Sequence, residues 1–121
     1  MKKRLISFTL TAAVMTLATL LTPASRPQDA PRRIEVTAKR FTYEPGEITL
    51  KKGEPVVLVI KSADVSHGLN VRELKIDAKV GAGETAEVQL TPQKTGTFIG
   101  HCSVFCGPGH ASMKLTLHVV D

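Results

Sequence analysis

Short runs of apolar residues, most of them alternating with polar ones, recur from residue 34 to the end of this chain and limit its fold more than any other feature. The runs fall at residues 34–38, 48–50, 55–60, 69–71, 74–80, 85–90, 97–101 and 114–120. A period of two is typical of half-buried strands, and turn residues such as Pro45 and Gly46 separate the runs. No segment of this part shows a convincing helical period. The pattern predicts an all-β domain, built as a β-sandwich or a barrel.

Two of these runs predict which side chains face the interior. The run at 55–60 is apolar at consecutive positions, as expected for a strand that is covered on both faces. The last run places one parity of side chains toward the core, and this parity holds Met113, Leu115, Leu117 and Val119.

The N-terminal segment has the pattern of an export signal. Lys2, Lys3 and Arg4 precede an apolar run at 5–21, and small residues follow it up to Ala24. Residues 1–24 are therefore predicted to be a secretory signal peptide or, alternatively, an uncleaved N-terminal membrane anchor, because a run of about 17 residues is just long enough to span a bilayer. Either alternative exports the remainder of the chain to the periplasm or the outer face of the cytoplasmic membrane.

The proline-containing residues 25–33 are predicted to be a linker, and residues 34–121 the single domain that a chain of 121 residues allows. The formal net charge of +5 arises from the N-terminal part, since residues 41–121 hold eight basic and nine acidic side chains. A nearly neutral domain argues against nucleic-acid binding. The basic N-terminal stretch is instead suited to lie beside anionic lipid.

Near the C-terminus, residues 102–113 gather soft metal ligands in the spacing C-x3-C-x3-H-x2-M. This stretch holds both cysteines of the chain, one of its four histidines and the only methionine after residue 15. Sulfur and nitrogen donors select copper, zinc or iron clusters over magnesium or calcium. Gly107, Pro108 and Gly109 exclude a regular helix, so a tight loop is expected to bring the donors together.

The other histidines differ in their suitability as ligands. His118 and His101 lie on the parity opposite to the core-facing residues of their strands, and both are expected to stay outside the site. His67 follows the apolar strand at 55–60 and precedes another strand. Because copper–thiolate sites usually contain two imidazoles and the loop supplies only His110, we predict His67 as the second.

The segments Asp64-Val65-Ser66-His67 and 102–113 make the chain similar to the cupredoxins, and within them to the CuA domains of cytochrome c oxidase subunit II. The resemblance covers about residues 34–121 and implies a Greek-key β-sandwich. It also implies a centre of two copper ions. The ligands that it implies are the bridging thiolates of Cys102 and Cys106, the imidazoles of His67 and His110, the weak axial thioether of Met113 and the backbone carbonyl of Val104. The chain departs from the family's usual pattern at Val104, where a glutamate is common, and in having no tryptophan.

The implied function is electron transfer with a redox partner such as cytochrome c or a haem-copper oxidase subunit. No group of residues has the pattern of an acid, base or nucleophile, so we expect no catalysis from this chain alone, and expect it to act as a subunit of an oxidase-like complex or by itself. Three alternatives remain open. These are a Cys102–Cys106 disulfide, a zinc site made from the same residues, and a periplasmic carrier that delivers copper to a CuA-containing oxidase.

Overall fold

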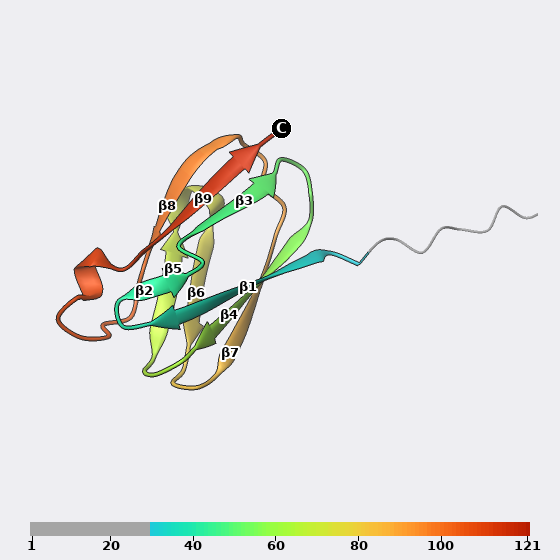
Figure 1. Ribbon diagram of the computed structural model, residues 1–121. Helices are drawn as coiled ribbons and strands as arrows, with labels where there is room; N and C mark the ends of the chain where they lie inside the picture. Colours follow the sequence, from blue (N-terminus) through green and yellow to red (C-terminus); the bar gives the residue numbers. More distant parts are fainter. Residues whose placement is uncertain (1–29) are drawn as a thin grey trace, which may run out of the picture.

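The computed structural model describes residues 30–121, which form nine strands and two single-turn 3-10 helices (Figure 1). The predicted signal or anchor at 1–24, and most of the linker at 25–33, lie outside the described residues. The elements are β1 (Arg32–Lys39), β2 (Thr42–Glu44), β3 (Glu47–Lys51), β4 (Val56–Ser62), β5 (His67–Val71), η1 (Arg72–Leu74), β6 (Ile76–Val80), β7 (Thr85–Leu90), β8 (Gly96–His101), η2 (His110–Ser112) and β9 (Lys114–Val120).

The strands form two sheets that pack face to face as a β-sandwich. One sheet has the order β2-β1-β4-β7 and the other the order β3-β9-β8-β5-β6. The β1–β4 and β3–β9 pairs are parallel, whereas β8 and β9 are antiparallel neighbours that flank the 102–113 loop. The predicted all-β sandwich is confirmed.

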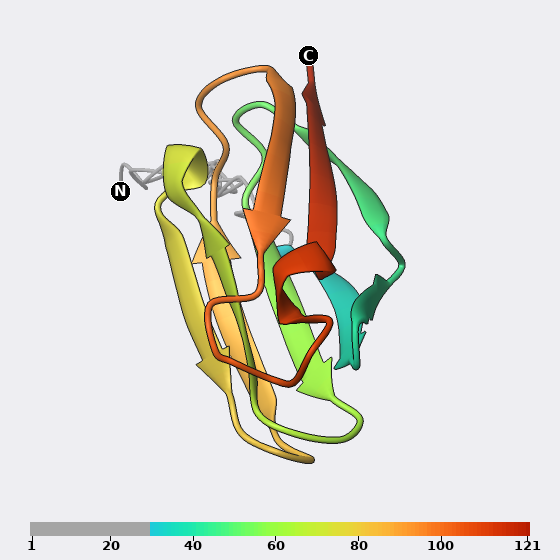
Figure 2. The same ribbon diagram turned by 90° about the vertical axis from the view of Figure 1, so that its left-hand side faces the viewer.

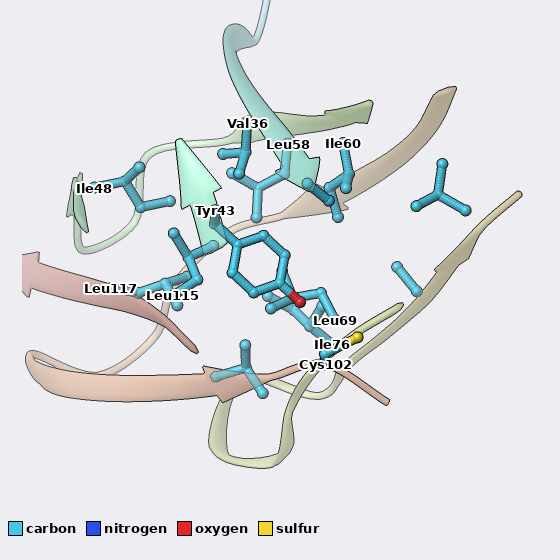
Figure 3. Close-up of a cluster of buried hydrophobic side chains, with 14 of the residues drawn as sticks. Val36, Tyr43, Ile48, Leu58, Ile60, Leu69, Ile76, Cys102, Leu115 and Leu117 are labelled. Carbon is cyan, nitrogen blue, oxygen red and sulfur yellow. The ribbon is translucent and has the colours of Figure 1, made fainter. Parts of the chain in front are cut away.

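The core lies between the two sheets and follows the predicted alternation. Leu115 and Leu117 of β9 and Leu58 and Ile60 of β4 are fully buried and belong to one cluster, with Tyr43 drawn between the two pairs (Figure 3). Burying one such side chain contributes roughly 1.5–3 kcal/mol. Cys102 belongs to the same cluster, so the first residue of the ligand loop is anchored in the core.

Strand β4 is buried on both faces, as the sequence predicted, but no further sheet or helix of residues 30–121 covers its outer side. Val57 and Val59 are 6% and 3% exposed there. The side chains of Arg33 in β1 and Glu87 in β7 form an ion pair that passes across β4 at this level. Long charged side chains cover neighbouring apolar surface with their aliphatic stems, which is consistent with the burial of the two valines.

Three details differ from the sequence-based expectation. The first strand begins at Arg32 rather than near Ile34. Strand β2 was not predicted, because three residues with only Tyr43 buried are too few to show a period. The run at 74–80 begins as a strand only at Ile76, after η1 and a left-handed residue, Lys75.

Within residues 30–121, no helix is long and apolar enough to cross a membrane.

Candidate metal centre

The loop at 102–113 crosses one end of the sandwich between β8 and β9 (Figure 2). The backbone N–H of Cys102 donates to the carbonyl of Met113 at 3.3 Å and closes the base of the loop. Gly107 has a φ of 134°, a conformation that glycine adopts without steric cost, and there the chain turns back toward η2. The loop thereby points both of its cysteines inward.

Both thiols are buried and free, and each has an imidazole beside it. Cys102 and Cys106 are 6% and 4% exposed. Their Sγ atoms lie 3.9 Å apart, well beyond the roughly 2.05 Å of a disulfide bond. The Nδ1 atom of His67 lies 3.9 Å from Cys102 Sγ, and Nδ1 of His110 lies 3.7 Å from Cys106 Sγ.

A further donor atom accompanies each thiol. The carbonyl oxygen of Val104 lies 3.1 Å from Cys102 Sγ, and the Met113 Sδ atom lies 3.9 Å from Cys106 Sγ. Nitrogen and sulfur ligands at about 2.0 and 2.3 Å from one tetrahedral ion are roughly 3.5 Å apart, so these spacings fit donors that share a metal. All six residues predicted as ligands are therefore brought together at one end of the sandwich.

Burial changes the ionisation of two groups at the site. Burial raises the pKa of the Cys106 thiol, and the neighbouring Cys102 thiol raises it further. Burial also raises the pKa of Tyr43, whose hydroxyl donates to the Gly68 carbonyl close to Cys102. The Cys106 thiol therefore resists ionisation by itself, whereas a bound cation deprotonates a coordinating thiol.

His67 is held by hydrogen bonds as well as by packing. It is the first residue of β5 and is fully buried. Its Nε2 atom lies 2.6 Å from Oδ1 of Asp64. The carboxylate of Asp64 also accepts the backbone N–H groups of Arg40, at 2.8 Å, and Val65, at 2.6 Å. Desolvation favours the neutral acid, but these donors outweigh it and lower the pKa of Asp64 to about 2.

The turn between β1 and β2 supports the ligand loop without supplying a ligand. The side chain of Arg40 donates from Nε to the carbonyl of Cys106 at 3.1 Å. The ring of Phe41 lies directly beneath two glycines of the loop. A Cβ atom on Gly107 would lie 3.0 Å from this ring, and one on Gly109 would lie 2.4 Å from it. The turn and the loop are thus in close contact.

On its outer side the site comes close to solvent. His110 is half-buried, and its ring lies 5.6 Å from the ring of Phe105 in a tilted arrangement. Phe105 itself is 79% exposed. A shallow hollow beside it is lined by Arg40, Val65, Ser66, Phe105, Cys106 and Gly107.

The two remaining histidines lie outside the site, as the strand parity predicted. His101 is exposed on β8, and His118 on β9 contacts Glu47 at 3.2 Å. Sequence reasoning missed the roles of Asp64 and Arg40. Asp64 stands in one of the two segments that carry the resemblance, and its three-residue spacing from His67 could also have pointed to the carboxylate.

Comparison with known proteins agrees with the fold and the loop. The family model described as "Cupredoxin-like domain" matches residues 10–116. Cytochrome c oxidase subunit 2 of Thermus thermophilus is 35% identical over 88 residues, which are 73% of this chain and 65% of that protein. Probable cytochrome c oxidase subunit 2 of Streptomyces avermitilis is 38% identical over 81 residues, covering 66% of this chain and 25% of that protein. The chain thus spans less than two thirds of either relative.

Among solved structures, the periplasmic domain of subunit II of cytochrome oxidase of Bradyrhizobium japonicum is similar, with a TM-score of 0.69. The two are 22% identical, and the match covers 78% of this chain and 87% of that one. At this identity the likeness concerns the fold.

Proposed function

The chain belongs to the cupredoxin-like family, and from this premise we propose that its domain holds two copper ions in a CuA centre and transfers single electrons. Copper, when bound, supplies the one-electron redox chemistry. The protein supplies a fixed donor set, which consists of His67, Cys102, Val104, Cys106, His110 and Met113.

One observation carries the proposal of two ions rather than one. Cys102 and Cys106 face each other at 3.9 Å, and each has its own imidazole and its own additional donor. A mononuclear copper–thiolate site would use both imidazoles but only one thiolate, so the second buried thiol would have no role in it. A pair of facing thiols, each with further donors of its own, therefore favours a site that would hold two ions.

Electron transfer is favoured because the donors are held in place before any ion arrives. His67, Met113 and both cysteines are buried, and the loop is fixed at both ends by strands β8 and β9. A rigid and largely dry donor set reorganises little when the charge of the centre changes. The outer side, with Phe105 exposed against His110, offers a short route between the centre and a docked protein.

The proposed partner is a redox protein such as cytochrome c or a haem-copper oxidase subunit, met in the periplasm or at the outer face of the cytoplasmic membrane. The relatives' names, cytochrome c oxidase subunit 2, favour such a partner. Strand β1 begins at Arg32 and ends at Lys39, next to the β1–β2 turn that contacts the ligand loop. About 26 Å of strand therefore separates the start of the domain from the centre. If residues 1–24 act as an uncleaved anchor and 25–33 as a linker, the centre lies at the end of the domain away from the membrane attachment.

The first experiment counts copper and records optical and paramagnetic-resonance spectra of the thiol-reduced, copper-loaded protein. Two ions per chain with a mixed-valence signal are expected, and Cys106→Ser should hold at most one ion without that signal. A single ion in the wild-type protein, a zinc preference or a stable disulfide would refute the proposal.

The second experiment separates electron transfer from copper delivery. Copper-loaded protein is mixed with a reduced cytochrome c and, separately, with a copper-free CuA domain. Rapid oxidation of the cytochrome with copper retained is expected. Complete copper handover with negligible electron exchange would instead identify a copper carrier.

A further inference from the structure

Asp64 lies in the 62–67 turn between β4 and β5, three residues before His67, and contacts Arg40 of the β1–β2 turn. Its Oδ1 atom faces Nε2 of His67 at 2.6 Å, on the side of the ring opposite to Nδ1. Nδ1 is the atom that faces Cys102, at 3.9 Å. The imidazole is therefore contacted at one nitrogen by a carboxylate and at the other by a thiol.

We propose that Asp64 is a positioning residue of the copper centre, which accepts the Nε2 proton of His67 and so leaves Nδ1 unprotonated toward Cys102. This inference rests on the proposed function, because it names how one ligand of that site is oriented. A carboxylate behind a metal-binding imidazole fixes its tautomer and ring orientation and increases its basicity.

The carboxylate can do this because it is itself fixed. Oδ2 accepts the backbone N–H of Arg40 at 2.8 Å, and Oδ1 also accepts the backbone N–H of Val65 at 2.6 Å. The side chain of Arg40 continues the connection to the carbonyl of Cys106 at 3.1 Å. Hydrogen bonds thus link the orientation of His67 to the backbone of the cysteine loop through residues that are not ligands.

A purely structural role for Asp64 is the competing explanation, since its bonds to two backbone N–H groups alone would order the 62–67 turn. The two roles predict different results. Replacing a purely structural residue changes the stability of the copper-free protein. Replacing a positioning residue also changes the orientation of His67 and the properties of the bound copper.

The first test needs no metal. Nitrogen-15 NMR of the imidazole of His67 in the reduced, copper-free protein at pH 8 should show a proton on Nε2 and none on Nδ1. A proton on Nδ1 alone would overturn the proposal, because Nε2 could then donate nothing to Asp64.

The second test compares Asp64→Ala and Asp64→Asn with Glu87→Ala. Glu87 pairs with Arg33 on the outer face of the β2-β1-β4-β7 sheet. Its replacement by alanine removes the same charge as Asp64→Ala does, but away from the site. Asp64→Ala should weaken copper binding about 10- to 100-fold and raise the reduction potential. A tenfold loss of preference for the oxidised centre corresponds to about 59 mV. Asp64→Asn, which keeps an acceptor oxygen but not the charge, should show a smaller change.

Copper affinity and potential in both Asp64 variants equal to those of Glu87→Ala would overturn the proposal, provided that wild-type protein gives the two-copper signal. Absence of that signal in wild-type protein would instead refute the proposed function. The NMR result on the copper-free protein is independent of that outcome, so the two failures are distinguishable.

Discussion

A methyl group added at Gly109 should disturb the ligand loop without changing any ligand. Gly109 has a φ of −90°, which any residue adopts, so Gly109→Ala carries no backbone strain. The new Cβ would lie 2.4, 2.5 and 3.0 Å from three atoms of the Phe41 ring. Carbon atoms normally approach to about 3.5–4.0 Å, so the ring or the loop must move by roughly 1 Å.

Both movements are costly. Phe41 packs against the hydrophobic core, and overpacking of this kind costs about 1–3 kcal/mol. For a domain of this size, each kcal/mol lowers Tm by about 4–8 °C. Movement of the loop instead carries His110, the next residue, away from Cys106, whose Sγ atom lies 3.7 Å from Nδ1. We therefore expect a lower Tm in the copper-free protein together with weaker copper binding.

Gly46→Ala is the matched control, because its Cβ would meet only the carbonyl of Tyr43 at an ordinary 3.6 Å. Urea unfolding of the copper-free variants and copper titration of both would give the comparison. The double variant Gly109→Ala with Phe41→Leu should recover part of the loss, since the smaller side chain makes room. A Gly109→Ala protein as stable as Gly46→Ala, with equal copper affinity, would show that this contact does not hold the loop.

Three further predictions concern single side chains. Met113→Leu should retain copper and shift the reduction potential, because an axial thioether mainly tunes the metal and the swap conserves volume in the core; loss of copper would contradict this. His101→Ala should leave copper binding unchanged whereas His67→Ala should abolish the two-copper signal, and the reverse result would overturn the choice of ligand. Because the folded pKa of Asp64 is about 2 against an ordinary 3.8, its contribution to stability is present above pH 4 and is lost as the pH falls toward 2. Urea unfolding of the copper-free proteins measures this loss. Over this interval the free energy of unfolding of wild type should fall by about 1 kcal/mol more than that of Asp64→Asn, a value that allows for solvent screening of this partly exposed group. Equal losses in the two proteins would argue against the assigned hydrogen bonds.

The sequence predicted those features that depend on near neighbours along the chain. The apolar alternation of residues 114–120 is enough to place Leu115 and Leu117 in the core, since a period of two fixes which face each side chain takes. The spacing of the loop donors likewise predicted that Cys106 and His110 would meet, because glycine and proline force the chain between them to turn.

The features that the sequence did not predict depend on contacts between segments that lie far apart along the chain. Strand β2 exists because it pairs with β1 and buries Tyr43, and three residues carry no period of their own. The Arg40–Asp64 and Arg40–Cys106 hydrogen bonds join residues 24 and 66 positions apart. Nothing in the local pattern around Arg40 distinguishes it from any exposed arginine that follows a strand.

The ligands and the residues that hold them in place therefore differ in how far the sequence predicts them. The ligands of the loop form one compact motif, whereas the supports of the site are single residues of the β1–β2 turn and the 62–67 turn. An electron-transfer centre needs both, because its ligands must keep one geometry in two charge states. In this domain Arg40, Phe41 and Asp64 supply contacts that the metal does not provide. A chain with the same cysteine loop but without these supports would keep the donors and lose the rigidity on which fast electron transfer depends.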